Sequence, residues 1–462
     1  MRDQCICWNA CILCSNPEDW WIDRGRATPC SEGSISGSLS EEATCFINCL
    51  RGFLIMNKKV YDTIILGAGA AGLYSGIFAA MHNESVLLLE KSKTPGNKLS
   101  ITGNGHCNFT HDEIHASDYT TDDVDALIWS FSAYSFKDTL RDFMDFGIPS
   151  ECKNHGFYPL SQDAKSVVSV FLNLLDKYKA NLQFDENVRG IERTEDGFLI
   201  KTNHDIYHGK RVIVAMGGKS YPKTGSNGDG YYYLEKFGHH IETPLPSLTP
   251  FICKDYDSSL FGVRQMGCIH LLIDGCEVNQ ARGEIQFTKT GISGICGFQM
   301  SLYASRPLTE GQDVRLRLSI LDDITLDYLL DISKNQGSHT TITDAYLGIL
   351  NRKLLVYILN KVGINPEAMA KEIRKEDINR FYQMLSNLEF QVTELGDFSQ
   401  AQSTCGGVLL SEIDPMTMES KIVPGLYFAG EIVNVNGLCG GYNLQWAWTS
   451  AYLSGSNNKY KG

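Results

Sequence analysis

The first clear pattern along the chain is a change of apolar spacing, from strand-like to helix-like and back, between residues 60 and 89. The mainly apolar run from Val60 to Leu66 is typical of a buried parallel strand. Ala70 to Met81 is rich in alanine and other small residues and predicts a helix, and Ser85 to Leu89 predicts a second strand. Together the three segments predict a βαβ unit.

Glycines at the turn between the first strand and the helix give this unit its candidate chemistry. Gly67, Gly69 and Gly72 form the frame Gly-x-Gly-x-x-Gly. In such a frame the first glycine permits a tight turn, the second lets a pyrophosphate approach the backbone, and the third lets helix and strand pack closely. Glu90 follows the second strand, where a carboxylate binds ribose hydroxyls and repels a 2′-phosphate, which favours FAD or NAD over NADP. The alternative is a glycine-rich turn that matches the frame by chance.

The pattern continues with mixed helical and strand-like segments. The predicted elements are a polar, glycine-rich loop over 91–108, amphipathic helices over Ala126–Phe146 and Ala164–Tyr178, a β-meander over Leu182–His208 with a hairpin turn at 195–197, and a buried strand over Arg211–Ala215. That strand runs into Gly217 and Gly218. Because ligands sit at the carboxyl ends of strands in doubly wound sheets, these glycines are candidates to contact a dinucleotide; an ordinary strand-to-loop turn is the alternative.

A proline-rich stretch from Pro244 to Pro250 marks a crossing between domains, since neither a helix nor a central strand can absorb it. Beyond it, short alternating segments predict a small antiparallel barrel or sandwich over 251–321. Helical spacing then follows around Tyr328 and over Leu347–Asn360 and Ile378–Leu385, and a strand within 421–431, a loop over 434–441 and a helix over 442–453 close the chain. The predicted fold is α/β, with a discontinuous Rossmann-type domain over 56–246 and 400–462, an inserted β-barrel over 247–323 and a helical subdomain over 324–399.

Residues 1–55 show neither helical nor strand periodicity and carry seven cysteines among Ser, Gly and Asp. We interpret them as an N-terminal extension that is unstructured or results from a misplaced start, with Met56 as the expected beginning. The alternative is a metal or redox role for Cys11-x-x-Cys14 together with Cys5 and Cys7, although no second cluster with zinc-finger spacing follows. No metal site is expected elsewhere.

Composition narrows the class of partner. The formal net charge is −13, and no long basic run is present, so we expect no nucleic-acid partner. The chain has no apolar stretch of the roughly 20 residues that cross a bilayer and no basic-then-apolar secretory signal, which predicts a cytoplasmic protein without a membrane partner. The eight cysteines after Met56 lack paired spacing, as expected of reduced thiols. A small molecule is the expected substrate.

Five separated motifs carry a resemblance to a known family. They are the glycine frame with Glu90, Ile101-Thr102-Gly103-Asn104-Gly105-His106-Cys107-Asn108, Gly217-Gly218-Lys219-Ser220-Tyr221-Pro222-Lys223-Thr224-Gly225, Phe287-Thr288-Lys289-Thr290-Gly291-Ile292-Ser293-Gly294, and Gly437-Leu438-Cys439-Gly440-Gly441-Tyr442-Asn443-Leu444-Gln445. In this order they resemble the bacterial FAD-binding family typified by BaiN-like bile-acid reductases, also labelled aminoacetone-oxidase-like, among the two-dinucleotide-binding-domain flavoproteins. The resemblance covers the chain from Met56 to its C-terminus.

The resemblance implies a Rossmann-type FAD domain interrupted by a β-barrel and a helical insert, with FAD as the bound dinucleotide. It places the glycine frame at the pyrophosphate, Glu90 at the ribose and the 437–443 turn at the isoalloxazine. The residues it implies for FAD are Gly67, Ala68, Gly69, Ala70, Ala71, Gly72, Glu90, Lys91, Lys98, Thr102, Gly103, Asn104, Gly105, Cys107, Asn108, Val188, Gly217, Gly218, Gly430, Glu431, Gly437, Gly440, Gly441, Tyr442 and Asn443.

The chain departs from the family pattern at two positions. His106 stands where relatives often carry Arg, so a permanent cation is replaced by a group that titrates near neutral pH. Ile295 stands where relatives commonly have Pro. His106 and Tyr442 are the candidate catalytic residues, as proton donors or substrate contacts, with structural roles as the alternative. Cys107 and Cys439 both fall in flavin-contacting loops, but without a Cys-x-x-Cys pair a redox disulfide is the weaker interpretation.

The leading functional hypothesis is an FAD-dependent oxidoreductase that moves a hydride from NAD(P)H, through flavin N5, to a small organic acceptor with an activated C=C bond. No second strand–glycine frame–helix unit is present, so NAD(P)H is expected to dock transiently as electron donor. The alternatives are a flavin-dependent amine or aminoketone oxidase, and a non-catalytic flavin-binding scaffold or RNA-associated protein.

Overall fold

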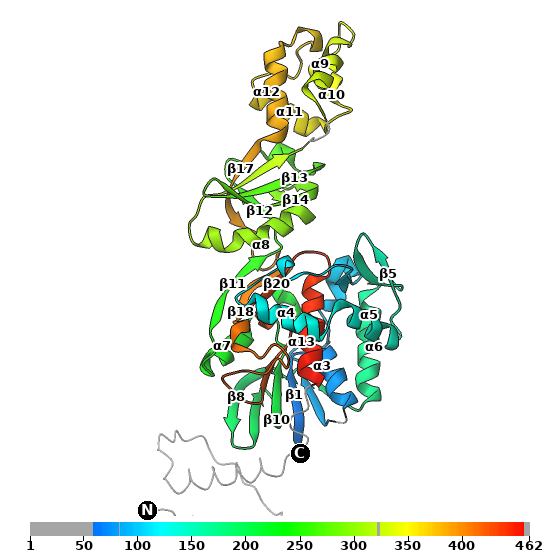
Figure 1. Ribbon diagram of the computed structural model, residues 1–462, viewed down its shortest axis with the longest axis vertical. Coiled ribbons are helices and arrows are strands. Elements are labelled where there is room, and N and C mark those ends of the chain that lie inside the picture. Colours follow the sequence, from blue (N-terminus) through cyan, green and yellow to red (C-terminus); the bar gives the residue numbers. More distant parts are fainter. Residues whose placement is uncertain (1–58, 83, 321–323, 457–462) are drawn as a thin grey trace, which may run out of the picture. The chain divides into compact units, whose positions relative to one another are not determined.

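The computed structural model describes residues 59–82, 84–320 and 324–456 (Figure 1). The N-terminal extension and its Cys11–Cys14 pair lie outside the described residues. Within them, buried apolar side chains form two clusters, one drawn from 64–234 and 408–453 and the other from 251–392. We call the described residues of 59–247 and 396–456 the Rossmann part, and those of 248–395 the insert.

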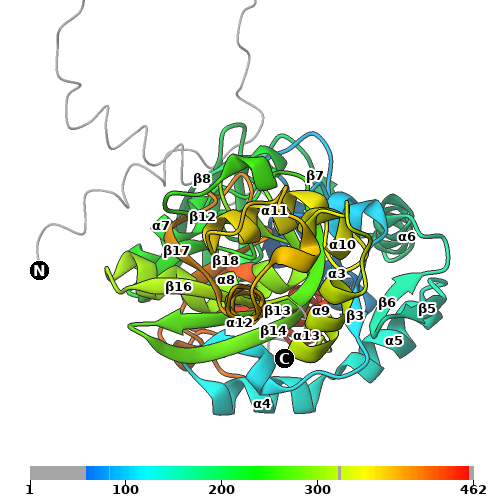
Figure 2. The same cartoon turned by 90° about the horizontal axis from the view of Figure 1, so that it is seen from above.

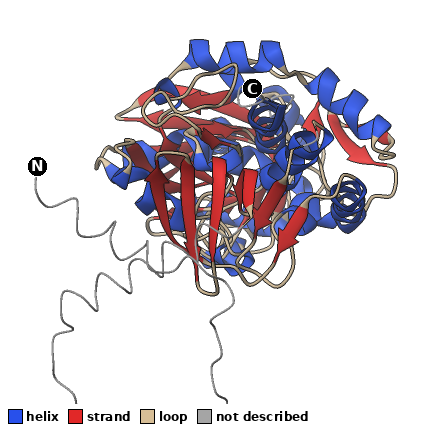
Figure 3. Ribbon diagram, turned by 90° about the horizontal axis from the view of Figure 1, so that it is seen from below, coloured by secondary structure: helices blue, strands red, loops and turns tan. Residues whose placement is uncertain are grey.

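The central sheet of the Rossmann part is built on parallel strands and extended by an antiparallel meander (Figure 3). Its strands, in spatial order, are β7 (Asn181–Gln183), β2 (Val86–Leu89), β1 (Val60–Leu66), β10 (Ile206–Val214), β9 (Gly197–Thr202) and β8 (Val188–Thr194), and β19 (Leu426–Phe428) also pairs with β10. β10 pairs in parallel with β1 and β19 and antiparallel with β9. One strand therefore replaces the expected end of the meander and the separate strand over Arg211–Ala215.

Two helices from opposite ends of the chain pack together beside this sheet. They are α3 (Ala70–Met81) and α13 (Tyr442–Ser456), blue and red in Figure 1. A Cβ atom at Gly455 would lie 2.6 Å from the carbonyl oxygen of Ser75, so only glycine permits this approach of the two helices. The predicted helix over 70–81 is confirmed to the residue, and the C-terminal helix is three residues longer than predicted.

The helix predicted over Ala126–Phe146 is in fact two helices, α4 (Val124–Ala133) and α5 (Phe136–Asp145). Ser135 begins the second helix, and its backbone N–H and hydroxyl both donate to the Asp138 carboxylate, as in a capping box. Tyr134, at the break, is buried and bonded to Asp142, which fixes the bend. The apolar spacing alone did not reveal this local cap.

The remaining elements of the Rossmann part are short. They are α6 (Ala164–Lys177), α7 (Asp229–Lys236), the sheet of β3 (Thr110–His111), β6 (Gly156–Pro159) and β5 (Ser150–Lys153), the pair of β4 (Tyr119–Thr121) and β20 (Val435–Gly437), the pair of β11 (Ile241–Ser247) and β18 (Ser403–Val408), and 3-10 turns at Leu99–Gly105, Ala116–Asp118, Pro222–Thr224, Leu410–Glu412 and Gly430–Ile432. Part of the proline-rich segment is thus a strand, β11. It pairs with β18 alone, so both strands are edge strands, where proline is tolerated.

The insert contains a six-stranded sheet whose longest hairpin joins β13 and β14 (Figure 2). The strands, in order, are β12 (Phe251–Cys253), β17 (Leu388–Leu395), β16 (Val314–Ser319), β13 (Arg264–Ile273), β14 (Cys276–Phe287) and β15 (Ile292–Ser293). The backbone N–H of Cys253 donates to Thr290 O across the two edges at 2.9 Å, so the sheet nearly closes into a barrel. The mixed α/β fold with a near-barrel sheet is as expected.

Two elements of the insert differ from expectation. α8 (Ile295–Thr309), which packs against β14, was missed because Gly297 and Pro307 obscure its helical pattern. β17 returns to the barrel from a region expected to be helical, because Leu388, Phe390 and Val392 alternate with exposed residues.

Between β16 and β17, the described residues form four helices and a 3-10 turn. They are α9 (Leu326–Lys334), α10 (Ile342–Tyr346), α11 (Arg352–Lys361), α12 (Lys375–Ser386) and the turn Ala370–Glu372. Among the residues that the structure describes, no helix is long and apolar enough to cross a membrane.

Candidate cofactor-binding site

The turn after β1 gives each glycine of the frame a different role. Gly67 has φ +98°, and a Cβ there would lie 2.6 Å from Ala215 O. A Cβ at Gly72 would lie only 1.9 Å from Gly67 O, so the helix can start this close to the turn only with glycine. A Cβ at Gly69 would meet nothing within 4 Å. The turn is therefore tight on one side and open on the other.

The open side faces a pocket with an empty volume of about 1280 Å³, including solvent at its mouth. Of the residues expected to bind FAD, the pocket is lined by Gly67, Ala68, Gly69, Ala70, Ala71, Glu90, Lys91, Lys98, Thr102, Val188, Gly217, Gly430, Glu431 and Asn443. Its lining also includes residues that were not named individually as candidates: Thr94, Gly96, Asn97 and Leu99 of the predicted 91–108 loop, Thr224, Gly225 and Leu444 of the family motifs, and Leu89, Glu186, Asn187, Ala215, Met216, Ser226, Asn227, Asp229, Gln402, Ser403, Ala429, Val435, Trp446 and Ala447. No periodicity or motif marks most of these positions.

The N-terminus of α3 is suited to an anion. Its N-cap is Gly69, no side chain caps it, and its first turn has no acidic residue. The first N–H groups of a helix have no partner within the helix and carry about half a positive charge. A diphosphate at the open face of Gly69 would satisfy them.

Glu90 is held against the glycine turn by both of its carboxylate oxygens. Oε2 accepts from the backbone N–H of Ala68 and Oε1 from that of Ser92, each at 2.8 Å. A carboxylate has about four acceptor positions, so each oxygen retains capacity for a ribose hydroxyl. Beside it, Lys91 Nζ reaches Asn227 at 2.6 Å and Asp229 at 2.9 Å, which ties the β2 loop to α7 across the lining of the pocket.

A second acidic residue, Glu431, is paired rather than free. Lys98 Nζ lies 2.6 Å from Glu431 Oε2, and the hydroxyl of Ser220 donates to Oε1 at 2.8 Å. The backbone N–H of Thr404 also donates to Oε1 at 2.8 Å. The fold thus brings together two predicted site residues, Lys98 and Glu431, and makes this wall of the pocket locally neutral.

Packing explains the glycines that follow β10. A Cβ at Gly218 would lie 2.4 Å from Thr404 Oγ1, so this glycine is required by the neighbouring strand, whereas Gly217 has φ +69° and lines the pocket. Of the two interpretations of these glycines, the structural one therefore applies to Gly218, while Gly217 remains a candidate to contact a ligand. Ser403, also in the lining, has a buried hydroxyl with no hydrogen-bond partner among the described residues.

The loop that ends at Asn108 contributes less than expected. Thr102 lines the pocket, while Gly103, Asn104, Gly105, Cys107 and Asn108 do not. His106 is exposed, and its Nδ1 lies 2.9 Å from the carbonyl oxygen of Gln162. It is not brought together with Tyr442, so we do not carry it forward as a catalytic candidate.

The turn before α13 is fixed by Asn443, which lines the pocket. The backbone N–H of Gly437 donates to Asn443 Oδ1 at 2.9 Å, and Asn443 Nδ2 donates to Gly437 O at 2.8 Å. Gly437, Gly440 and Gly441 themselves lie outside the lining, as do Gly72, Gly218 and Tyr442. The hydroxyl of Tyr442 lies 3.2 Å from Nδ1 of His111. Sequence reasoning missed His111, which carries no motif signal beyond its place three residues after Asn108.

Cysteine chemistry has little support at the site. Burial raises the pKa of Cys107 to about 12 and that of Cys439 to about 12, so both are protonated thiols near neutral pH. The eight cysteines within the described ranges are free. In the same part of the chain, no group of three or more His, Cys, Asp or Glu side chains could hold a metal ion.

Comparisons with known proteins bear on this site as a whole. The family described as HI0933-like protein Rossmann domain matches residues 61–457. A 3-dehydro-bile acid delta(4,6)-reductase of Clostridium scindens is 30% identical over 397 residues, covering 85% of this chain and 97% of its own. Ribosomal RNA dihydrouridine synthases of Escherichia coli and Haemophilus influenzae are 28% and 30% identical, each covering 85% of this chain and 96% of its own.

Proposed function

The chain belongs to the HI0933-like family of FAD-binding, Rossmann-type oxidoreductases, and we propose that it reduces a carbon–carbon double bond conjugated to a carbonyl, with NADH or NADPH as electron donor. The observation that carries the proposal is the glycine turn of the pocket. Gly67 and Gly72 close it on the strand side, while Gly69 and the uncapped start of α3 leave it open toward the cavity.

The residues of the pocket fit FAD as follows. The N–H groups at the start of α3 would hold the diphosphate, and Glu90 would accept hydrogen bonds from the adenosine ribose. Glu431, paired with Lys98, would accept hydrogen bonds from the ribityl hydroxyls, and the turn held by Asn443 would face the ring system. Bound FAD supplies a position that accepts a hydride and delivers it again.

The substrate class rests on the names of the relatives. A delta(4,6)-reductase of a 3-dehydro-bile acid acts on double bonds conjugated to a 3-oxo group. Dihydrouridine is uridine whose 5,6 double bond, conjugated to a ring carbonyl, has been reduced. The shared chemistry is hydride addition to the carbon β to a carbonyl and proton addition to the α carbon.

The test uses protein made from Met56 and mixed under anaerobic conditions. We expect a yellow protein whose flavin absorbance is bleached by NADPH or NADH and restored by the probe 4-androstene-3,17-dione. Bleaching by an amine and not by either nicotinamide would favour the oxidase alternative. A colourless protein that stays colourless with excess FAD would overturn the proposal.

A second candidate substrate is a uridine of ribosomal RNA, which the two dihydrouridine synthase relatives favour. The net charge of −13 opposes it, because a protein that binds RNA neutralises phosphates with Lys and Arg. The same anaerobic experiment separates the two candidates. Restoration of flavin absorbance by unmodified ribosomal RNA, and not by the steroid enone, would favour the RNA substrate.

A further inference from the structure

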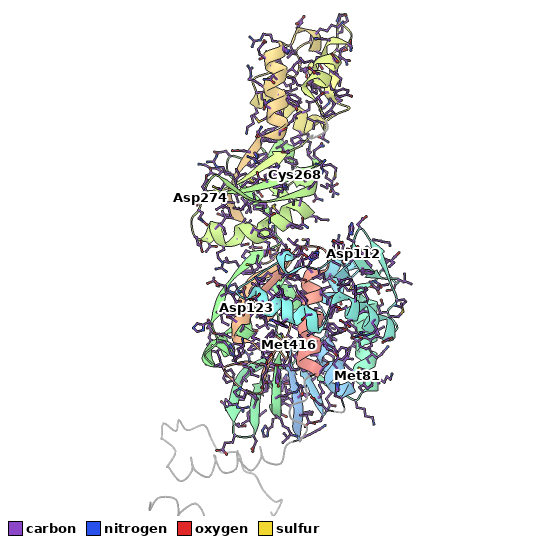
Figure 4. The ribbon with its side chains drawn as sticks, in the orientation of Figure 1. Met81, Asp112, Asp123, Cys268, Asp274 and Met416 are labelled. Carbon is purple, nitrogen blue, oxygen red and sulfur yellow. The ribbon has the colours of Figure 1, made fainter. Side chains whose placement is uncertain are left out.

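A histidine of the Rossmann part is enclosed by a segment that lies far from it in the sequence. His239 follows α7, and its side chain is fully buried. Its Nδ1 lies 2.9 Å from Oε2 of Glu412, and its Nε2 lies 2.8 Å from the hydroxyl oxygen of Ser420. Met416, which Figure 4 labels on the Rossmann part, lies between Glu412 and Ser420 in the segment that holds the ring.

The hydrogen bonds of Ser420 fix the protonation state of His239. The hydroxyl oxygen of Ser420 accepts from the backbone N–H groups of Ile422, at 3.0 Å, and Val423, at 2.8 Å. A serine hydroxyl has two acceptor lone pairs and one proton, so only the proton remains for His239. Nε2 of His239 is therefore an acceptor, and its Nδ1 carries the proton that is donated to Glu412. The form of the ring that satisfies all of these groups is neutral.

A second proton on the ring would have no acceptor. Protonation of Nε2 turns an N–H group toward the oxygen of Ser420, whose two lone pairs already bind the backbone of the turn over 420–423. Ser420 is 6% exposed, so water cannot replace either partner unless the segment moves. Protonation of His239 therefore requires the turn to release a backbone N–H group or the ring to leave its site.

The surroundings of the ring disfavour its charged form. Burial acts to lower the pKa of His239, Glu412 acts to raise it, and the neighbouring His240 acts to lower it further. Burial is the largest of these effects, so the pKa of His239 lies below its ordinary value. The other charged groups on the adjoining elements are Glu235 and Lys236, which are exposed, and Glu242, Asp414, Glu419 and Lys421, which have partners of their own.

The ring also contacts the strand that leads into the cofactor pocket. The ring centroids of His239 and Phe428, the last residue of β19, are 5.0 Å apart, and the two rings are nearly perpendicular. The backbone N–H of Ser420 donates to Leu426 O at 2.7 Å, which ties the turn to the first residue of the same strand. Residues 429–431 follow β19 directly and line the pocket. Movement of the turn therefore acts on both ends of β19 and on the backbone that faces the cofactor.

We propose that His239 makes FAD binding sensitive to acid, because protonation of its Nε2 opens the turn over 420–423 and displaces β19; this rests on the FAD site of the proposed function and not on its substrate. The opened state exposes the ring and gives it the ordinary histidine pKa of about 6.5. Because the pKa in the closed state is the lower one, the closed state keeps its full stability above about pH 6.5. Below that value the opened state takes up one proton more, and the closed state is lost by up to about tenfold per pH unit until the pH reaches the lowered pKa.

The first test follows release of FAD from diluted holoprotein by the rise in flavin fluorescence. In the wild type, the rate constant of release should be constant between about pH 8 and 7 and should rise by up to about tenfold between about pH 6.5 and 5.5. His239→Gln keeps a donor and an acceptor at this position but does not titrate, so it should remove most of the rise. The same pH dependence in His239→Gln and wild type would overturn the proposal.

Two controls accompany this measurement. His240→Gln changes the neighbouring histidine, which also pairs with Glu412 but has a side chain 79% exposed, and it should keep the wild-type dependence on pH. Far-UV circular dichroism of the wild type at about pH 5.5 should stay constant while FAD is released, because the opening is local. Loss of the whole signal together with the flavin would mean that acid unfolds the protein globally, and it would overturn the local opening.

A second measurement observes the ring itself and needs no turnover. In holoprotein with ¹⁵N-labelled histidine, the His239 signals are assigned by their loss in His239→Gln or His239→Asn. At about pH 7.5, Nδ1 should carry a proton and Nε2 should not, and this state should persist until flavin is released. A charged ring or a proton on Nε2 would overturn the proposal. The expected ring state and acid release without enone reduction would refute only the proposed substrate class, whereas enone reduction with release that does not depend on pH would refute only the role of His239.

Discussion

The Rossmann part and the insert bury different kinds of side chain. In the Rossmann part, Arg211 and Glu84 form an ion pair 2.9 Å apart with side chains 2% and 3% exposed, and Arg211 also donates to Thr63. In the insert, a representative pair is Arg264 with Glu284, whose side chains are 66% and 44% exposed. The insert thus folds around an apolar core with charges outside, while the Rossmann part encloses a buried polar network.

The pocket follows the same division. Its lining residues come from 67–229 and 402–447, and within the described residues the insert supplies none of them. A dinucleotide site needs close backbone approach and fixed hydrogen-bond partners, and these requirements appear in the sequence as glycines and charged residues at set positions. A barrel and a helical cluster that need only to pack leave apolar periodicity. This difference explains why a cofactor site is easier to predict from this sequence than a substrate site.

The largest effect is expected at the glycine turn. Gly72→Ala places a Cβ where only 1.9 Å separates it from Gly67 O, so we expect at least about a 100-fold loss of FAD affinity together with a destabilised Rossmann part. Gly69→Ala should fold normally and weaken FAD only, because its methyl group points into open space. The flavin content of the purified variants measures FAD binding, and thermal unfolding measures their stability.

The matched control lies in the insert. A Cβ at Gly283 would lie 3.6 Å from Cys296 Cβ, which is ordinary contact, so Gly283→Ala should keep full flavin content and stability. Normal FAD binding by Gly72→Ala would refute the assigned packing role of this glycine.

An effect of comparable size, on stability alone, is expected from breaking the buried ion pair of Arg211 with Glu84. Arg211→Met leaves the Glu84 carboxylate buried without its cation and should lower the free energy of unfolding by about 3 kcal/mol. Arg264→Met in the insert should cost less than about 0.5 kcal/mol, because exposed pairs contribute little. Denaturant unfolding, monitored by the release of flavin, measures the free energy of unfolding of both variants. Similar losses in both variants would erase the distinction drawn between the two regions.

The next largest effect is expected from breaking the ion pair of Lys98 with Glu431 in the pocket lining. Lys98→Met leaves Glu431 as an unbalanced negative charge facing the cofactor, and we expect FAD to bind about tenfold more weakly or worse. Lys93→Met, an exposed position in the same loop, should leave the affinity unchanged. Titration of apoprotein with FAD measures both variants. Equal affinities for Lys98→Met and wild type would mean that the pair is structural only.

Sequence reasoning identified elements with strong local patterns, and it did not identify contacts between residues that lie far apart in the chain. The strand over 60–66, the helix over 70–81 and the family were confirmed, because each rests on a continuous pattern or motif. α8 was missed because glycine and proline interrupt its pattern, and the meeting of Lys98 with Glu431, 333 positions apart, exists only in the folded chain. His111 was missed because its partner, Tyr442, is 331 positions away in the sequence.

The smallest effect concerns acid stability and again contrasts the two regions. Asp122 accepts hydrogen bonds at 3.0 Å from the backbone N–H groups of Leu410 and Ser411 and from Asn434 Nδ2, and so ties the segment before α4 to the C-terminal half of the Rossmann part. Burial acts to raise the pKa of Asp122, but these donors together hold it below its ordinary value.

Because the folded pKa of Asp122 is the lower one, its contribution is fully present above the unfolded value, about 3.9, and is lost as pH falls through the folded value. Asp122→Asn should therefore lower stability at pH 7 by less than about 1 kcal/mol, since the side chain is solvent-screened, and flatten the acid limb below about pH 4. Asp331→Asn, at an exposed position of α9 in the insert, should alter neither. If thermal unfolding between pH 3 and 7 showed the larger acid-limb change for Asp331→Asn, the hydrogen bonds of Asp122 would not be the source of the stability that is lost below pH 4.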